Sequence, residues 1–162
     1  MPGTTSKLNA IGGRLVNPAW VCFAWFGITA GAGLLAITAI FAADMATRPV
    51  SLDIARTLFE RLVNVEFAFL ILLLIMIRTT GQAMKLWSVS AVLALIMLGQ
   101  AAWLIPELSS RTDMIIGGNE PPPSIAHAAY SISTLVKLGL LFGLGLSLIP
   151  ARPARRDVQE QA

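Results

Sequence analysis

The stretch SISTLVKLGLLFGLGL, residues 131–146, places one lysine in a run that is otherwise apolar, glycine or hydroxyl-bearing. The longer segment 125–149 contains no other Lys, Arg, Asp or Glu. At 1.5 Å of rise per residue, a helix of this length crosses a hydrocarbon core of about 30 Å. A charge near the centre of such a helix costs about 2.5–3.5 kcal/mol unless it is compensated. The stretch therefore predicts a membrane helix in which Lys137 needs a polar partner.

The composition supports a membrane location for the whole chain. Of the 162 residues, 56% are hydrophobic and only 13% are charged, and the mean hydropathy is +0.72. A soluble domain of this size needs a more strongly charged surface. The net charge of +3 is explained by basic residues that flank apolar segments, so we expect no nucleic-acid partner. The single cysteine, Cys22, excludes an internal disulfide and a metal site built from cysteines.

Three more apolar segments resemble the one that holds Lys137. The four predicted spans are residues 18–43, 58–77, 86–105 and 125–149. Between them we expect a loop of about fourteen residues containing MATRPVSLD, a short link TTGQAMK, and a loop RTDMIIGGNEPPPS. The predicted fold is all-α, an integral membrane four-helix bundle with up-down-up-down topology. Residues 1–17 form an N-terminal segment and residues 150–162 a disordered tail.

The distribution of basic residues predicts the orientation. If the N-terminus is cytoplasmic, seven basic residues lie on the cytoplasmic side and four on the other: Lys7, Arg14, Arg78, Lys85, Arg152, Arg155 and Arg156 against Arg48, Arg56, Arg61 and Arg111. Cytoplasmic loops of membrane proteins carry an excess of Lys and Arg. Both termini are therefore predicted to be cytoplasmic.

Glu66 is the charge predicted to lie at the depth of Lys137. It precedes Arg78 by twelve residues and Lys137 precedes Pro150 by thirteen, so both lie about 18–20 Å from the cytoplasmic ends of their helices. An ion pair between them is the simplest compensation. Alternatively, the lysine loses a proton and the glutamate gains one, and each is neutral by itself.

Other polar residues extend this predicted intramembrane cluster. On a helical wheel, His127, Tyr130, Ser131, Thr134 and Lys137 fall within about 120° of arc, which leads from the outer surface to the lysine. Gln100 lies slightly further out on the third span, and Asn64 points about 160° away from Glu66 on the second. The candidate cluster comprises Glu66, Lys137, Gln100, Thr134, His127 and Asn64, although Asn64 and Glu66 cannot face the same neighbour.

Two pairs of glycines have the spacing of helix-packing motifs. Gly27 and Gly31 are four residues apart in the first span, and Gly139 and Gly143 in the fourth. Small residues at this spacing let helices approach closely in lipid. Either the first and fourth helices pack on each other through these glycines, or one of them contacts another chain.

A catalytic site is the least favoured interpretation. Arg56, Glu60, Glu107, Arg111 and His127 could converge near the outer loops, but the sequence contains no nucleotide-binding, metalloprotease or hydrolase motif. The single histidine cannot supply the paired axial ligands of a typical membrane haem. We therefore predict no catalytic residue, no metal and no cofactor.

Four segments resemble a known family: the small-residue first helix, RTLFERL, WLIPELSSR and PPPSIAHAAYSISTLVKLGLL. Together they are similar to small four-helix membrane proteins of bacteria, of unknown function, related to the transmembrane protein 205-like family. The resemblance covers about residues 26–148 and implies a multi-pass protein of the bacterial cytoplasmic membrane. Its family-like positions are Arg56, Pro106, Arg111, His127, Tyr130 and Lys137.

The sequence favours a non-catalytic membrane component, either an accessory or structural subunit of a larger assembly or a homo-oligomer. Its expected partners are the lipid bilayer and other membrane subunits or further copies of itself. The alternative is a small transporter or an ion- or proton-handling protein that uses the polar stripe from His127 to Lys137.

Overall fold

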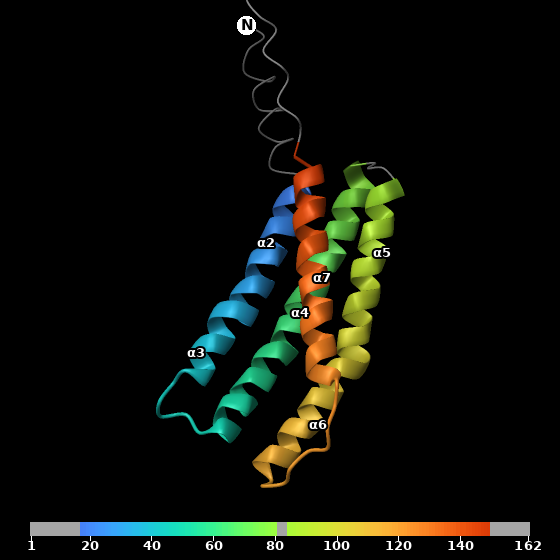
Figure 1. Ribbon diagram of the computed structural model, residues 1–162. Helices are drawn as coiled ribbons and strands as arrows, with labels where there is room; N and C mark the ends of the chain where they lie inside the picture. Colours follow the sequence, from blue (N-terminus) through green and yellow to red (C-terminus); the bar gives the residue numbers. More distant parts are fainter. Residues whose placement is uncertain (1–16, 81–83, 150–162) are drawn as a thin grey trace, which may run out of the picture.

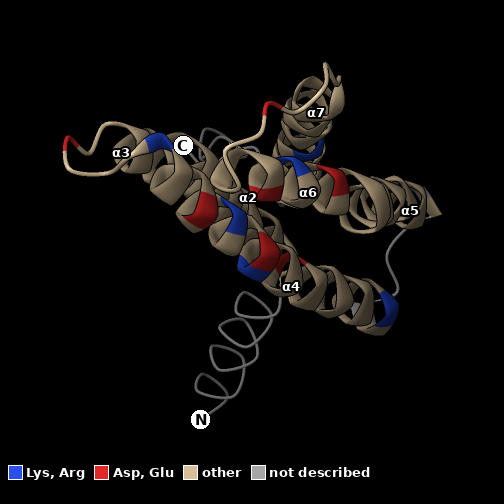
Figure 2. Ribbon diagram, turned by 90° about the horizontal axis from the view of Figure 1, so that it is seen from below, with Lys and Arg blue, Asp and Glu red and all other residues tan. Residues whose placement is uncertain are grey.

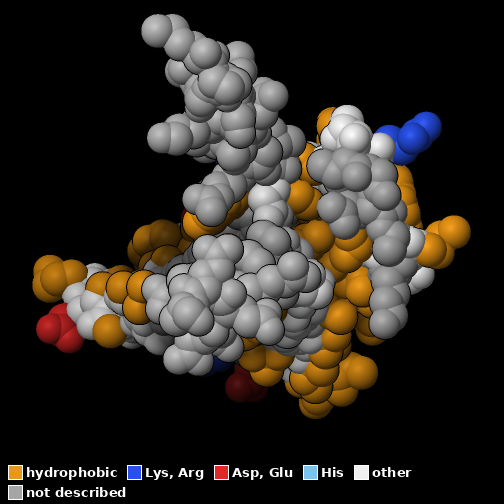
Figure 3. Space-filling model, turned by 90° about the horizontal axis from the view of Figure 1, so that it is seen from above, with side chains coloured by type: hydrophobic (Ala, Val, Ile, Leu, Met, Phe, Trp, Pro, Cys, Tyr) orange, Lys and Arg blue, Asp and Glu red, His pale blue; other side chains and the backbone are white. Residues whose placement is uncertain are grey.

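The computed structural model describes residues 17–80 and 84–149, and these are helical with no strand. The predicted N-terminal segment lies almost wholly outside the described residues, and the predicted tail lies entirely outside them. Four helical stretches are long and apolar enough to cross a membrane: Ala19–Phe41, Arg48–Thr79, Leu86–Ile116 and Ala126–Ser147. Hydrophobic side chains such as Leu35, Leu95 and Leu135 are exposed along them, which is typical of a surface that contacts lipid. Hydrophobic side chains also lie at the part of the surface seen from above (Figure 3).

The first stretch is one continuous helix with a wide turn in its middle. It consists of α2 (Ala19–Ala30), the π-helical segment η1 (Gly31–Ala36) and α3 (Ile37–Phe41). Asn17 begins it, since its side-chain oxygen accepts a hydrogen bond from the Ala19 N–H at 2.9 Å. The Asn17 amide also donates to the Leu148 carbonyl at 3.0 Å, so the start of α2 lies beside the end of α7 (Figure 1).

The second helix begins earlier than the apolar pattern predicts. Helix α4 spans Arg48–Thr80, so it starts ten residues before the predicted span at 58, and the expected loop of about fourteen residues is wrong. Pro49 lies in the first turn, where the missing N–H removes no helical bond. The helix continues through polar residues, whereas a span predicted from hydropathy stops where the polar residues begin.

The third helix also extends beyond its predicted span. It consists of α5 (Met84–Gly99), the π-helical segment η2 (Gln100–Leu104) and α6 (Ile105–Ile116), and so continues eleven residues past position 105. Pro106 lies directly after the π-helical turn. A proline ring collides with the carbonyl four residues earlier in a regular helix, and a widened turn relieves that collision. Gly118, at φ 78°, follows the end of α6, and residues 119–124 lead to the last helix.

Helix α7 (Ala126–Ser147) packs against α2 and closes the bundle. The start of α2, the ends of α7 and α4 and the start of α5 lie at one end, and the α3–α4 loop and α6 at the other (Figure 1). We call the latter the α6 end. Buried residues form two apolar clusters, one around Trp25, Leu73, Met97 and Leu141 and a smaller one around Leu104 and Tyr130 at the α6 end.

Candidate functional site

A buried ion pair lies between the two apolar clusters. Glu66 Oε2 is 2.7 Å from Lys137 Nζ, and the two side chains are 1% and 0% exposed. On α4, Glu66 lies between the buried Leu62 and Leu70, and on α7, Lys137 lies one turn before the buried Leu141. The contact predicted from equal depth in the two helices is therefore present.

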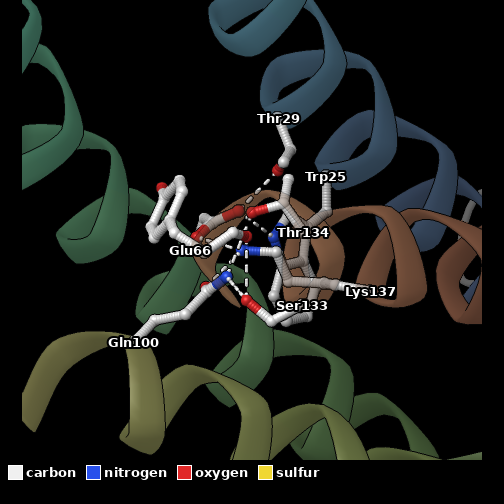
Figure 4. Close-up of polar contacts among 8 residues, drawn as sticks. Trp25, Thr29, Glu66, Gln100, Ser133, Thr134 and Lys137 are labelled. Carbon is white, nitrogen blue, oxygen red and sulfur yellow. Dashed lines mark hydrogen bonds and ion pairs between the residues drawn. The ribbon is translucent and has the colours of Figure 1, made fainter. Parts of the chain in front are cut away.

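The remaining hydrogen-bonding capacity of the pair is used by other helices. Glu66 Oε1 accepts bonds from Trp25 Nε1 at 3.2 Å and from Thr29 Oγ1 at 2.5 Å. Lys137 Nζ donates a second bond, to Gln100 Oε1 at 2.9 Å. Both oxygens of the carboxylate thus have donors, as a buried carboxylate requires. Figure 4 shows these side chains pointing toward one another, and they come from α2, α4, η2 and α7.

Gln100 links the pair to the hydroxyl groups of α7. Its Nε2 donates to Ser133 Oγ at 2.8 Å and to Thr134 Oγ1 at 3.1 Å. We call the seven residues Trp25, Thr29, Glu66, Gln100, Ser133, Thr134 and Lys137 the polar cluster. Gln100 opens the π-helical turn η2, and Thr29 lies two residues before the π-helical turn η1. Such turns change the direction of side chains on the two sides of the insertion and are frequent at functional sites.

The polar cluster contains some of the residues predicted for it and others that were not predicted. Glu66, Lys137, Gln100 and Thr134 belong to it, but Asn64 does not: its side chain is exposed and donates to the Glu60 carbonyl at 3.1 Å. Trp25, Thr29 and Ser133 were missed by sequence reasoning. One signal was available, because Trp25 lies seven residues, about 10 Å, inside its predicted span, where a tryptophan N–H needs an acceptor.

His127 also lies apart from the polar cluster. Its side chain is exposed, and its backbone carbonyl accepts a bond from Ser131 at 2.9 Å. The predicted stripe therefore divides: Tyr130, Thr134 and Lys137 face the interior, whereas His127 and Ser131 face outward. In the part of the chain that the structure describes, no group of His, Cys, Asp and Glu side chains is arranged to hold a metal ion.

The polar cluster is buried and its groups bond one another, which limits the chemistry that it can perform. A carboxylate that already accepts three hydrogen bonds, inside a packed interior, is poorly placed to act as a base. Among the described residues, Ser90 Oγ on α5 is the one buried side-chain polar atom without a hydrogen-bond partner. The polar cluster thus satisfies its own members and holds four helices in one register.

Of the two roles predicted for the glycines, packing of α2 on α7 through these residues is not found, and contact with another chain stays a prediction. Helices α2 and α7 do pack on each other, but a Cβ added at Gly27, Gly31, Gly139 or Gly143 would meet nothing within 4 Å. The close approach is made instead at Gly145, where an added Cβ would lie 2.8 Å from Phe23 Cζ. The four predicted glycines face away from the bundle interior.

At the α6 end, charged residues gather on α4 and α6 (Figure 2). Arg56 forms ion pairs with Asp53, at 2.5 Å, and with Asp113. Arg111 lies 3.8 Å from Glu107, and Ser109 donates to Glu60 at 3.2 Å. The predicted outer charges therefore lie in one region, where each has a partner.

Beside these charges is a cavity of about 150 Å³. Its lining comes from α3, α4, α6 and α7 and includes Phe41, Ala55, Arg56, His127 and Tyr130. Arg56 and His127 thus share a cavity, as their predicted convergence near the loops requires.

The chain matches no protein-family model, and comparisons with curated proteins and with solved structures find no match.

Proposed function

We propose that this protein is a non-catalytic component of a membrane, an accessory or structural subunit of an assembly or a homo-oligomer. Its four helices cross the bilayer in up-down-up-down order with both termini in the cytoplasm. The positive-inside distribution of Lys and Arg supports this orientation. The resemblance to the transmembrane protein 205-like family, and with it a bacterial cytoplasmic membrane, is part of the proposal.

The observation that carries this proposal is the closed polar cluster. Its ion pair is 0–1% exposed, and every hydrogen bond from it ends on another helix of the same chain. Buried polar groups of this kind can fix the register of helices, since any other packing leaves a charge without a partner. A bundle locked in this way is suited to present a fixed outer surface to a neighbouring protein.

The outward-facing glycines supply a surface for such a neighbour. Gly139 and Gly143 are exposed on α7, and among the described residues no atom lies within 4 Å of a Cβ added at either glycine. Small residues on a lipid-facing helix allow another membrane helix to approach closely. We place the contact with a partner subunit, or with a second copy, on this face of α7.

The mass of the assembly tests the proposal. The tagged full chain is extracted from native membranes in a mild detergent, and the mass and every co-purifying protein are determined. We expect a complex larger than one chain, which the variant Gly139→Leu with Gly143→Leu disrupts. Gly99→Leu is the matched control, because Gly99 is also exposed and has nothing within 4 Å, but lies on α5. A monomer in the unmodified protein would contradict the proposal.

A second candidate, ion or proton handling, is favoured by one observation. Tyr130 lines the cavity and interacts with Thr134, which is joined through Gln100 to Lys137. This series of polar groups leads from the α6 end to the buried pair. The candidate predicts a flux in proteoliposomes that is lost when both Thr134 and Lys137 are replaced by leucine. A flux that persists in a folded variant would eliminate it.

A further inference from the structure

The cavity at the α6 end has walls suited to hydrocarbon. Seven of its lining residues are apolar: Ile37, Phe41, Leu52, Ala55, Phe59, Ile105 and Leu108. Phe41 is 49% exposed, so the cavity reaches the apolar flank of the bundle. Its volume of about 150 Å³ is below the range of about 300–1,000 Å³ that is usual for whole small-molecule ligands. The space suits part of a chain better than a compact molecule.

The polar groups of the lining are already bonded, with one exception. Ser109 donates to Glu60, and Thr112 donates to the Leu108 carbonyl at 3.0 Å. Arg56 is held by two carboxylates, and Tyr130 interacts with Thr134. Among the described residues, no partner is found for the imidazole of His127, which is exposed. A ligand therefore meets apolar walls and one free hydrogen-bonding side chain.

The charge around the cavity opposes an anionic ligand. Arg56 carries one positive charge, whereas its partners Asp53 and Asp113 carry two negative charges and are 51% and 65% exposed. The same imbalance holds for residues 44–61 and 107–120, where six carboxylates outnumber four guanidinium groups: Asp44, Asp53, Glu60, Glu107, Asp113 and Glu120 against Arg48, Arg56, Arg61 and Arg111. An ammonium group is attracted to such a surface, and an additional anion is repelled.

We propose that this cavity binds one acyl chain of a phospholipid whose headgroup carries an amine. The part of the chain next to the ester occupies the space between Phe41, Ala55 and Leu108. His127 donates a hydrogen bond to an ester carbonyl, and the ammonium group lies near Asp53 and Asp113. The site requires only that the four helices cross a bilayer, so it is independent of the proposed subunit role.

Photo-crosslinking of lipid to the full chain in vesicles tests the site. The probe is a phospholipid with a diazirine on the first few carbons of one acyl chain after the ester, prepared with an ethanolamine or a glycerol headgroup. We expect labelling concentrated on residues 52–59 and 105–112, and several-fold stronger with the ethanolamine headgroup. Even labelling of all exposed apolar residues, or a preference for the anionic glycerol headgroup, would overturn the proposal.

Two variants separate the acyl chain from the headgroup. Ala55→Leu fills the cavity and is expected to reduce labelling about tenfold, since a single added group strongly affects binding in an apolar pocket. The matched control is Ala68→Leu, an exposed position on the same helix, which should leave labelling unchanged. If Ala55→Leu fails to fold, Asp53→Asn with Asp113→Asn decides. This variant should keep the labelled residues and abolish the preference for ethanolamine, and an undiminished preference would refute the site.

Discussion

Two ion pairs join helices in this molecule, and they do so under opposite conditions. Glu66 and Lys137 are 1% and 0% exposed and join α4 to α7 in the interior. Arg56 and Asp113 are 25% and 65% exposed and join α4 to α6 at the end of the bundle. The first pair depends on every surrounding donor and acceptor, because no water can replace a hydrogen bond that is lost in the interior. The second pair can exchange its partner for solvent.

This difference teaches where the stability of the fold is vulnerable. Charges in a dry interior attract each other strongly, but removing one of them leaves the other without compensation. Exposed pairs are weakened by solvent and salt, and their partners are readily replaced. Changes to the polar cluster should therefore affect the whole bundle, and equivalent changes at the α6 end should not.

The largest effect is expected when Lys137 is replaced by methionine. Glu66 then remains buried with only Trp25 and Thr29 as donors, and the free energy of unfolding should fall by about 3–5 kcal/mol. Unfolding of the protein in detergent micelles, followed by circular dichroism, measures this loss.

A double variant shows whether the loss comes from the stranded charge. Glu66→Leu with Lys137→Met removes both charges, and buried pairs replaced by apolar groups are often nearly neutral. We expect it to be more stable than Lys137→Met alone. A double variant that is less stable than the single one would mean that Glu66 does not depend on Lys137.

Reversing the pair should be the next most damaging change. Glu66→Lys with Lys137→Glu preserves the attraction, but Trp25 Nε1 then faces an ammonium group and can only donate. Thr29 can rotate its hydroxyl to accept a bond, whereas tryptophan cannot. We expect the reversed protein to be more stable than either single reversal and less stable than the original. Full recovery in the same unfolding measurement would show that the Trp25 bond contributes little.

The ion pair could be predicted from the sequence, whereas the uncharged members of the polar cluster were harder to predict. Glu66 and Lys137 are charges in apolar helices, so their depth can be counted from the helix ends. Trp25 and Thr29 carry no charge, and tryptophans are usually expected at the membrane surface, so only the depth of Trp25 in its span marked its N–H as a donor. The face of Asn64 was the weak point of the prediction, since one helix cannot direct both Asn64 and Glu66 inward.

The helix boundaries were less predictable than the spans. Hydropathy detects the part of a helix that lies in hydrocarbon, but α4 and α6 continue through Arg56, Glu60, Glu107 and Asp113. Each of these side chains is polar, and the helical backbone satisfies its own hydrogen bonds whether or not lipid surrounds it. The π-helical turns also escape a periodic analysis, because each inserts a single residue into the repeat.

Thr29→Val sharpens the comparison with a smaller change. Valine has nearly the shape of threonine but lacks the hydroxyl that donates to Glu66 Oε1 at 2.5 Å. A lost hydrogen bond to a buried carboxylate should lower the free energy of unfolding by about 1–2 kcal/mol. The matched control is Thr38→Val on α3, where the hydroxyl bonds only the backbone of its own helix. Equal losses of unfolding free energy for the two variants would mean that the bond to Glu66 stabilises the fold no more than a bond to the backbone.

The smallest effect is expected for Asp113→Asn, although it removes an ion pair between two helices. Arg56 keeps Asp53, one turn away on α4, and both partners reach solvent. At physiological ionic strength we expect no measurable shift of the unfolding midpoint, and a small shift only in low salt, where screening is weak. The same circular dichroism measurement at two salt concentrations checks this. A loss as large as that of Thr29→Val, and independent of salt, would mean that the α6 end lies in a dry environment. The contrast between the two ion pairs would then come from the number of hydrogen bonds around each pair, not from exposure to water.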